Sequence, residues 1–297
     1  MISGSTMLSA IPVSAIDSGI GGVIVESTFG STSASASSAK PLTIQSSLGV
    51  LSAVSRRYVS LSLPASSYAG GTVRMYKEQT ITVIIPCLNE EQGIEKVLTR
   101  MPQFVDEVIV VDNGSTDGTP KVARSFGARV ISEDVRGYGR AYKTGFSWAT
   151  GDIIITLDGD HSYPPDAISY LLEAFLHLEV DFLNASRFPV RDHSAMSLKH
   201  KIGNLALSLA MSILYLRWVR DSQSGMWVFR RSILKEMKLV SDGMAFSEEI
   251  KIEALKSHRI RFAEISILYS SRLGEMKLNP WRDGMHNMWF LVRKRFS

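Results

Sequence analysis

From Thr80 onward the chain alternates short apolar runs with amphipathic stretches, and this alternation restricts its fold more than any other feature. The apolar runs predict strands at 81–85, 108–111, 129–131 and 153–157, and the stretches between them predict helices at 92–101, 119–126, 139–150 and 166–178. Strands about 25 residues apart with helices between them form βαβ units on a mostly parallel sheet, with helices on both faces. Such sheets bind ligands at the carboxyl ends of their strands, so the loops there are expected to carry the chemistry.

The fourth predicted strand runs directly into two carboxylates, Asp158 and Asp160, which are separated by Gly159. Mg²⁺ is commonly held by one or two carboxylates together with phosphate oxygens of a substrate. An Asp-x-Asp pair also occurs in solvated turns, but this pair follows a fully apolar strand. We therefore expect it to bind a divalent cation jointly with a phosphorylated ligand.

Two other strand ends place acidic and amide side chains at the same predicted edge. The first strand ends in Pro-Cys-Leu-Asn-Glu-Glu at 86–91, and the second in Asp-Asn-Gly-Ser-Thr-Asp-Gly-Thr at 112–119. Glu90 and Asn113 are suited to hydrogen-bonding a base and a ribose. Asp117 is better explained as a cap of the following helix.

These three ordered motifs together resemble glycosyltransferase family 2, and in particular its dolichyl- and undecaprenyl-phosphate sugar transferase branch. The resemblance covers about residues 78–297 and extends to Ser-Arg-Phe at 186–188, Asp-Ser-Gln-Ser-Gly at 221–225 and Arg-Leu-Gly-Glu-Met-Lys at 272–277. It implies a GT-A type nucleotide-binding domain over residues 76–297. It also implies an inverting transfer of a hexose from a UDP- or GDP-sugar to a polyprenyl phosphate.

The resemblance implies roles for individual residues as well. Asp158 and Asp160 would hold Mg²⁺ or Mn²⁺ on the donor diphosphate. Arg187 and Arg272 would bind the acceptor phosphate, with Lys277 nearby. The nucleotide pocket would be lined by Pro86, Leu88, Glu90, Val111, Asn113, Asp158, Gly159 and Asp160.

The chain departs from the family pattern at several positions. Ser162 stands where the family often supplies a Gln to the metal, and Asn113 stands where it frequently has Asp. An amide oxygen can accept from the ring N–H of uracil but lacks the charge that suits the two donors of guanine, which favours UDP over GDP. In the segment 196–204, which resembles the start of the family's interfacial helix, His200 replaces the usual Arg and Lys201 lies beside it in the sequence.

Other polar residues have more than one interpretation. Arg140 or Lys143 is expected near phosphate, unless the segment around them is an ordinary turn. Asp221 and Gln223 are expected to face the donor sugar. His161 is interpreted as a turn residue, because imidazole is a poor ligand for Mg²⁺.

Glu248 and Glu249 lie where related enzymes with hydroxyl acceptors place a catalytic acid. A contact to a sugar hydroxyl or a carboxylate at a helix start explains them equally well. A transferase to a sugar or lipid hydroxyl is therefore the alternative enzyme function. A non-catalytic nucleotide-sugar binder is the alternative outside enzymes, and the intact acidic pair argues against it.

Two apolar segments bear on membrane association. No stretch offers about 20 consecutive apolar residues, so we predict no transmembrane helix. The segment 204–219 is apolar nearly all round, and 284–297 combines Trp, Phe and Met with three successive basic residues. Both fit helices at a membrane surface, although the first also fits a buried helix. The expected location is peripheral, at the cytoplasmic face of a membrane.

Residues 1–75 differ in composition from the rest of the chain. They are rich in Ser, Ala, Gly and Thr, and the low-complexity run at 31–39 cannot bury enough apolar area to fold. We expect a disordered tail, sequence upstream of a start at Met75, or a targeting segment. The net charge of +4 is too small to indicate nucleic-acid binding, and the single cysteine, Cys87, excludes an internal disulfide.

Overall fold

The computed structural model describes residues 13–17, 23–27, 78–190, 195–274 and 280–296. Within these ranges the chain forms one nine-stranded sheet with the strand order β1-β2-β9-β7-β8-β6-β3-β4-β5. The strands are β1 (Val13–Asp17), β2 (Val23–Ser27), β3 (Ile81–Cys87), β4 (Glu107–Asp112), β5 (Arg129–Ser132), β6 (Ile153–Thr156), β7 (Phe182–Ser186), β8 (Trp227–Arg230) and β9 (Phe262–Ser266).

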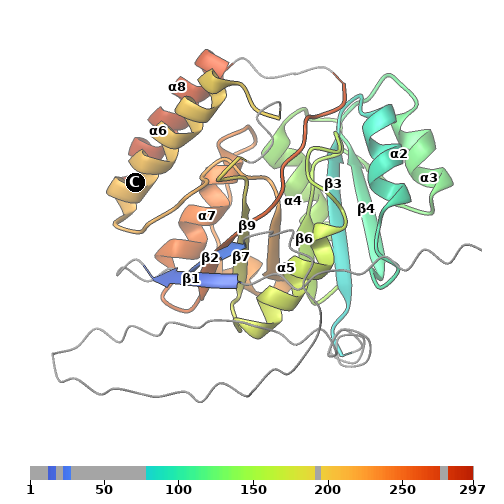
Figure 1. The fold of residues 1–297 in the computed structure, drawn as a ribbon. Helices are drawn as coiled ribbons and strands as arrows, with labels where there is room; N and C mark the ends of the chain where they lie inside the picture. Colours follow the sequence, from blue (N-terminus) through green and yellow to red (C-terminus); the bar gives the residue numbers. More distant parts are fainter. Residues whose placement is uncertain (1–12, 18–22, 28–77, 191–194, 275–279, 297) are drawn as a thin grey trace, which may run out of the picture.

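Helices follow most of the strands, as Figure 1 shows. They are α2 (Glu91–Thr99), α3 (Thr119–Ser125), α4 (Tyr138–Trp148), α5 (Ala167–His177), α6 (Leu198–Tyr215), the 3₁₀ helix η2 (Arg231–Glu236), α7 (Phe246–Lys256) and α8 (Pro280–Arg295). The four strands and four helices predicted between residues 81 and 178 are all present, with ends within two residues of the predicted ones.

The sheet is mostly parallel. In its centre β3 pairs in parallel with both β4 and β6, so that Ile84 lies opposite Ile109 on one side and Thr156 on the other. The exceptions are β8, which runs antiparallel to β6 and β7, and β1, which runs antiparallel to β2. The predicted α/β fold, a mostly parallel sheet with helices on both faces, is confirmed.

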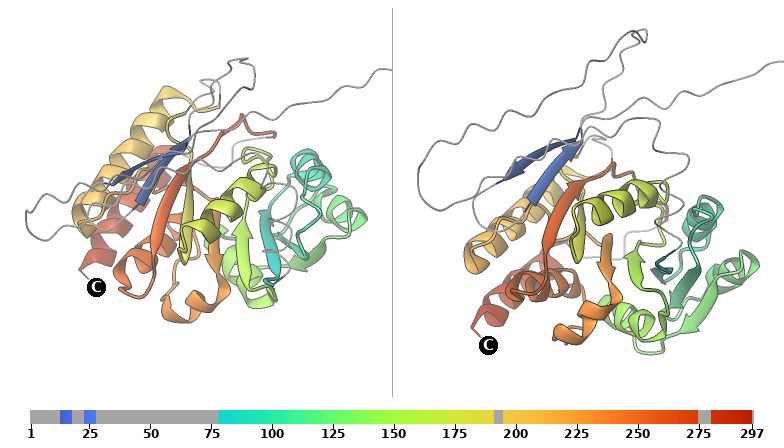
Figure 2. Two further views of the ribbon diagram at one scale, coloured as in Figure 1. Left: turned by 60° about the horizontal axis from the view of Figure 1, so that its bottom comes forward. Right: turned by 90° about the horizontal axis from the view of Figure 1, so that it is seen from below.

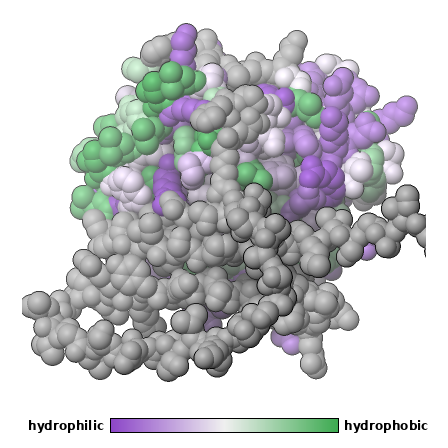
Figure 3. Space-filling view, in the orientation of Figure 1, coloured by the Kyte–Doolittle hydropathy of each residue, from purple (hydrophilic) through white to green (hydrophobic). Residues whose placement is uncertain are grey.

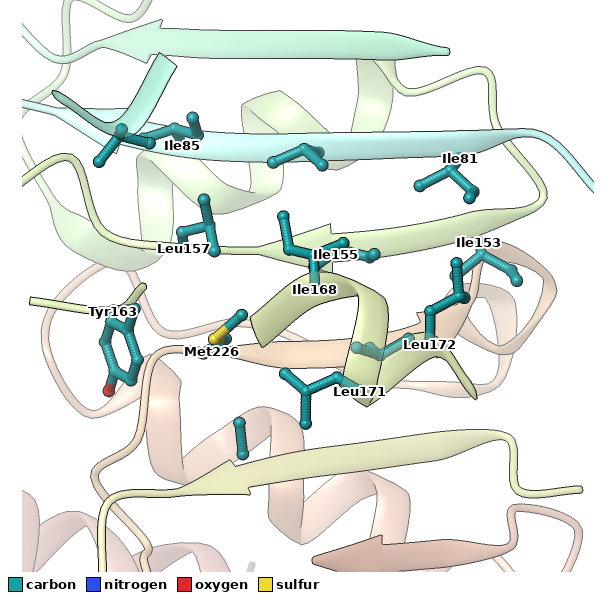
Figure 4. Packing of buried hydrophobic residues seen from close by; sticks show 14 of the residues in the cluster. Ile81, Ile85, Ile153, Ile155, Leu157, Tyr163, Ile168, Leu171, Leu172 and Met226 are labelled. Atoms are coloured by element: carbon teal, nitrogen blue, oxygen red, sulfur yellow. The ribbon is translucent and has the colours of Figure 1, made fainter. Parts of the chain in front are cut away.

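Each face of the sheet carries a hydrophobic core, because successive side chains of a strand point to opposite faces. On one face Ile81 and Ile85 of β3 pack with residues of α2, α3 and α5. Figure 4 shows part of this core, where Ile155 of β6 lies next to Ile168 of α5. On the other face Ile84 packs with α4 and α7. Figure 2 shows the two layers of helices on either side of the sheet.

Helices α6 and α8 form a further layer that rests on α7 rather than on the sheet (Figure 1). Leu207 and Met211 of α6, Ile252 of α7 and Leu291 of α8 make a small core between them. The Tyr215 hydroxyl donates to the backbone carbonyl of Leu291 at 3.2 Å. This layer corresponds to the two segments whose composition predicts membrane association.

The sequence predicts no element before Thr80, but the structure has two strands there. β2 pairs in parallel with β9, with Ile24 opposite Glu264, and β1 pairs with β2. The hairpin-like pair extends the sheet beyond β9, at the end of the sheet away from β3 and β4. The other residues of the segment 1–75 lie outside the described part of the chain.

Candidate active site

Four loops meet at one edge of the sheet. The carboxyl ends of β3, β4 and β6 lie together because these strands are parallel and adjacent. The fourth loop, residues 221–225, precedes β8 and reaches the same edge because β8 runs antiparallel to β6. The Thr156 hydroxyl ties this loop to β6, since it donates to the Gly225 carbonyl at 2.8 Å and accepts from the Trp227 backbone N–H at 2.9 Å.

The acidic pair sits in the middle of this edge. Gly159 between the two carboxylates is required by space, since a Cβ there would lie 2.5 Å from Sγ of Cys87. Two phenols from α4 face Asp158: the hydroxyls of Tyr138 and Tyr142 lie 3.4 and 3.5 Å from its Oδ1. Asp160 is buried, and its Oδ1 accepts from the Ser162 backbone N–H at 2.9 Å.

The electrostatics of the pair fit a cation site. Burial, and secondly the charge of Asp160, raise the pKa of Asp158 to about 7, against the opposing pull of Arg187 and Arg272. The positive charge of Arg187 and Arg272 is therefore not enough to keep both carboxylates ionised at neutral pH. A divalent cation would supply the missing charge, because such ions prefer oxygen ligands of this kind. The described residues contain no group of three or more His, Cys, Asp or Glu side chains placed to hold a metal, so phosphate and water oxygens would complete the coordination.

A cavity of about 270 Å³ opens beside the acidic pair. Seven of the eight residues predicted for the nucleotide pocket line it: Pro86, Leu88, Glu90, Asn113, Asp158, Gly159 and Asp160. The eighth, Val111, is fully buried in the core between β4 and α4, so its side chain does not reach the cavity. A larger cavity of about 690 Å³ shares Leu88, Glu90 and Arg136 with the first one.

Asn113 has a second task in this pocket. Its Nδ2 donates to the backbone carbonyls of Glu133 and Val135, both at 2.9 Å, and its Oδ1 accepts from the Gly137 N–H at 2.7 Å. The side chain thus fixes the loop between β5 and α4. The same loop carries Arg136, which lines both cavities and which the sequence analysis missed.

The predicted phosphate-binding side chains are in different surroundings. Arg272 lines the 270 Å³ cavity, with its Nη2 at 3.2 Å from Oε1 of Glu90 and 3.6 Å from Oδ2 of Asp160. Arg187 is buried and makes a bidentate ion pair with Asp221, at 2.8 and 2.7 Å. It therefore uses two of its five N–H donors on a protein carboxylate. Lys277 lies outside the described residues.

Asp221 and Gln223 face protein groups in this structure. Asp221 is bound to Arg187, and its pKa is lowered by that charge although its burial opposes the shift. Gln223 donates from Nε2 to Oε1 of Glu248 at 2.5 Å and accepts from Nδ2 of Asn287 at 2.9 Å. A hydrogen-bonded chain thus joins the 221–225 loop to α7 and to α8.

The two glutamates at the start of α7 have different roles. Both are fully buried. Glu249 accepts from the backbone N–H groups of Val240 and Ser241 and from Lys294, at 2.7–2.9 Å, and so holds a loop and α8 in place. Glu248 Oε2 has no hydrogen-bond partner, and burial raises the pKa of Glu248 well above 4.5.

The remaining candidates are mostly engaged elsewhere. Arg140 pairs with Glu133 at 3.3 Å and Lys143 with Asp242 at 2.6 Å, so both are engaged with protein carboxylates. His161 has a left-handed backbone conformation, with φ of 64°, as expected for a turn residue.

Comparison with known proteins agrees with this geometry. The model of the family described as "Glycosyl transferase family 2" matches residues 82–238, more than half of the chain. A dolichyl-phosphate hexose transferase of Haloferax volcanii is 31% identical over 70% of this chain and 91% of its own length. A low-salt glycan biosynthesis hexosyltransferase of the same organism is 34% identical over 72% of this chain, but the matched region spans only 53% of that relative.

Solved structures show the same architecture. Glucosyl-3-phosphoglycerate synthase from Mycobacterium tuberculosis, solved with Mn²⁺, UDP-glucose and phosphoglyceric acid, superimposes with a TM-score of 0.62 over 76% of this chain and 83% of its own, at 24% identity. At this identity the likeness establishes the GT-A fold alone. The family match and the H. volcanii relatives go further: this chain belongs to glycosyltransferase family 2.

Proposed function

We propose that this chain transfers a hexose from a nucleotide sugar to the phosphate of a polyprenol of the dolichyl type. The observation that carries the proposal is the acidic pair beside a cavity that seven of the predicted nucleotide-pocket residues line, with Arg272 at its rim. The names of relatives support the acceptor. They include the dolichyl-phosphate hexose transferase of H. volcanii and a UDP-N-acetylglucosamine–dolichyl-phosphate N-acetylglucosaminyltransferase of Methanococcus voltae, which is 31% identical over 53% of this chain.

The reaction is a single displacement at the anomeric carbon. An oxygen of the acceptor phosphate forms a bond to that carbon while the bond to the nucleoside diphosphate breaks, so the configuration inverts. A phosphomonoester has a second pKa of about 6, so it is largely a dianion at neutral pH and needs no general base. The protein must instead neutralise charge on both phosphate groups.

The residues divide this task between them. A divalent cation held by Asp158 and Asp160 would neutralise the diphosphate that leaves. Arg272 lines the same cavity and contacts Glu90 and Asp160 through partly exposed ion pairs of 3.2 and 3.6 Å. A phosphate dianion competes well for such a guanidinium, because phosphate accepts bidentate hydrogen bonds.

The donor is proposed to be a UDP-sugar rather than a GDP-sugar. Both N–H groups of the Asn113 amide are used by backbone carbonyls, and its Oδ1 already accepts one hydrogen bond. One lone pair of Oδ1 is then left for a ligand. It suits the single ring N–H of uracil and leaves one of the neighbouring guanine donors without a partner.

The acceptor is tested by a screen of UDP- and GDP-sugars with a short polyprenyl phosphate and Mn²⁺ or Mg²⁺. We expect a prenyl-phosphate-linked hexose from a UDP-sugar. The matched control is the same polyprenol without its phosphate, which should give no product. Product from the free alcohol, and none from the phosphate, would support the hydroxyl-acceptor alternative and contradict this proposal.

The metal is tested in the same assay. Asp160→Asn should lower kcat by at least about 10²-fold, the scale of losing one electrostatic stabiliser. Exposed Glu236 provides a control, since Glu236→Gln changes a carboxylate in η2, which follows β8 at the edge of the sheet opposite the 221–225 loop. Full activity in EDTA, or in the Asp160 variant, would show that no cation acts at this pair.

We further propose that the protein attaches to a membrane surface through α6 and α8. No helix in the described part of the chain is long and apolar enough to cross a bilayer. However, α6 and α8 each expose a stripe of apolar side chains three or four residues apart. The stripe along α6 and its C-terminal end comprises Leu198, Ile202, Leu205, Leu209, Ile213 and Leu216. The stripe along α8 and its C-terminal end comprises Met285, Trp289, Val292 and Phe296. We call these residues the apolar face. Figure 3 shows hydrophobic side chains gathered over this part of the molecule.

The proposed polyprenyl-phosphate acceptor explains why the protein would need such an apolar face. Its phosphate lies at the bilayer surface, so the site must approach that surface. An amphipathic helix of this kind lies in the interface with its apolar side chains among the lipids. The polar chain from Gln223 to Asn287 brings the apolar face and the 221–225 loop together within one packed unit.

A further inference from the structure

Lys251 lies in the middle of α7 and is fully buried. Its Nζ donates to three backbone carbonyls, those of Ser222 at 2.9 Å, Ser224 at 2.7 Å and Ser247 at 2.8 Å. An ammonium has three donors, so this arrangement satisfies every one of them. The Nζ also lies 5.2 Å from the centre of the Trp227 ring, within range of a cation–π contact.

This position is electrostatically expensive. Burial lowers the pKa of Lys251 to about 7, although the carboxylate of Asp221 pulls in the other direction. Within the described residues no carboxylate lies close enough to Lys251 to form an ion pair, so backbone dipoles carry the compensation. A buried Met would fill the same volume without this cost. The hydrogen bonds of the ammonium group therefore have a function at the backbone carbonyls that they contact.

Two of the three carbonyls belong to the 221–225 loop, and this loop contacts both Asp158 and Arg187. At its end, a Cβ on Gly225 would lie 3.1 and 3.2 Å from the two carboxylate oxygens of Asp158, so the loop backbone lies directly against that carboxylate. At its start, Asp221 holds the guanidinium of Arg187. A shift of the loop thus moves the surroundings of Asp158 and Arg187 together.

Other bonds also hold the loop, which separates the effect of Lys251 from folding. The Ser222 N–H donates to Oγ of Ser208 at 2.9 Å, the Ser224 hydroxyl donates to the Ala185 carbonyl, and the Gly225 N–H donates to the Tyr163 hydroxyl at 2.8 Å. With these contacts kept, loss of Lys251 leaves the loop attached but less exactly placed.

We infer that Lys251 is a positioning residue for the transfer reaction: its buried Nζ fixes the backbone of the 221–225 loop and thereby sets the position of Asp158 and Arg187. The inference rests on the proposed function, since it assigns Lys251 to the same reaction. Lys251 touches neither the cavities nor the acidic pair, so it acts through the loop alone.

The test replaces Lys251 by Met, which keeps the length and apolar volume of the side chain and removes its donors. Lys256→Met is the matched control, because Lys256 lies on the same helix and is exposed. Lys251→Gln is the second variant, since its amide retains two donors for the loop carbonyls. Circular dichroism and thermal melting establish that each protein is folded at the assay temperature.

We expect Lys251→Met to lower kcat by about 10- to 100-fold, since a misplacement of about 1 Å can cost ~10² in rate. Calorimetric binding of UMP without metal should stay within about twofold of wild type, because the proposed nucleoside contacts lie at the ends of β3 and β4 and do not involve a cation at Asp158. Lys251→Gln should recover part of kcat, and Lys256→Met should equal wild type. If Lys251 only stabilised the fold, kcat and nucleotide affinity would not change separately in this way.

Two results would overturn the inference: kcat of Lys251→Met within twofold of wild type, or nucleotide binding that falls in parallel with kcat. If Lys251→Met does not fold, Lys251→Gln decides the question by the same criteria. Failure of wild type itself to transfer a sugar to polyprenyl phosphate would contradict the proposed function instead, so the two failures are distinguishable.

Discussion

Arg187 and Arg272 illustrate how two residues of the same type take different parts in one site. Arg187 is buried against Asp221, whereas Arg272 is partly exposed beside Glu90 and Asp160. Removing one partner of a buried ion pair costs about 3–5 kcal/mol, because the other charge stays buried without compensation. Loss of a partly exposed pair costs about 0–1 kcal/mol. We therefore expect the two arginines to differ when each is replaced.

Arg187→Ala should lower the free energy of unfolding by about 3–5 kcal/mol in urea denaturation. Arg272→Ala should leave it within about 1 kcal/mol of wild type. In kinetics with saturating donor, Arg272→Ala should reduce kcat/KM for polyprenyl phosphate about tenfold or more, the loss of one hydrogen bond between charged groups. The opposite pattern, a stable Arg187→Ala protein and an unstable Arg272→Ala protein, would refute this division.

Glu248 gives a prediction about pH. Burial raises its pKa well above 4.5, while the hydrogen bond from Gln223 and the charge of Lys251 oppose the shift. An acid whose pKa is higher in the folded state keeps a proton that the unfolded chain releases. Stability therefore falls as pH rises from the ordinary pKa toward the folded one. Glu248→Gln removes this dependence, because an amide does not titrate in this range.

The difference in free energy of unfolding between Glu248→Gln and wild type should therefore grow in favour of the variant as pH rises above the ordinary carboxyl pKa of 4.5. Urea denaturation at several pH values measures it, and all other titrating groups are common to both proteins. A difference that does not change with pH would show that Glu248 ionises normally in the fold.

The carboxylates of the site could be predicted from the sequence, but its inner supports could not. Asp158 and Asp160 follow an apolar strand, and strand ends are where an α/β sheet exposes its ligands. Tyr142 and Lys251 lie within helices, where a Tyr or Lys is an ordinary residue. Only the packing of α4 and α7 on the sheet brings them to the Asp158 carboxylate and the 221–225 loop. Arg136 follows a short strand in a loop rich in charge, with no pattern that distinguishes it from its neighbours.

At the scale of elements, local pattern predicts the first half of the domain well. Strands of buried Ile and Val followed by amphipathic helices repeat there, so period and spacing suffice. The second half depends on long-range pairing. β8 is inserted antiparallel between β6 and β7, and the sequence does not specify that neighbour. For α6 the sequence allows burial or exposure of an almost wholly apolar helix, and the structure has one buried side and one exposed stripe.

Helix α8 changes one detail of the membrane interpretation. The sequence groups Arg293, Lys294 and Arg295 as a basic surface, but Lys294 is only 11% exposed and pairs with Glu249 at 2.8 Å and Glu253 at 3.0 Å. Lys294 therefore fastens α8 to α7. Arg293 lies over the ring of exposed Trp289, so it remains near the apolar face. Basic side chains near an anionic surface contribute about 1 kcal/mol each.

Liposome flotation tests the proposed attachment. Binding should need anionic lipid, weaken as salt is raised, and fall when Leu205 and Ile213 are both replaced by Gln. Phe126→Gln is the matched control, since Phe126 is an exposed apolar residue at the end of α3. Lys294→Gln should lower the melting temperature, because its ion pairs with Glu249 and Glu253 are lost, and should change liposome binding little. Equal flotation of the Leu205/Ile213 variant and wild type, or absence of wild-type binding to anionic liposomes, would contradict attachment through the apolar face.

At the scale of the whole molecule, the described strands β1 and β2 form one end of the sheet, away from β6 and the acidic pair that follows it. Every residue assigned to the candidate site lies between β3 and the loop after β9, and the acidic pair follows β6. β2 joins the sheet only through β9, which is separated from β6 by β7 and β8. The two described strands of the N-terminal segment therefore join the sheet away from the strand that carries the acidic pair.

A chain that begins at Met75 should consequently keep the kcat of the full chain and its affinity for nucleotide. Its melting temperature should be equal or lower, because β9 loses the pairing of Val23, Ile24 and Val25 and becomes an edge strand. An exposed edge also promotes association of copies, so light scattering should accompany the assay. A chain that begins at Val13 retains both strands and serves as the control. Loss of kcat in the shorter chain alone, with the protein monomeric and folded, would show that β1 and β2 support the site across the sheet, and that residues before Thr80 belong to the catalytic domain.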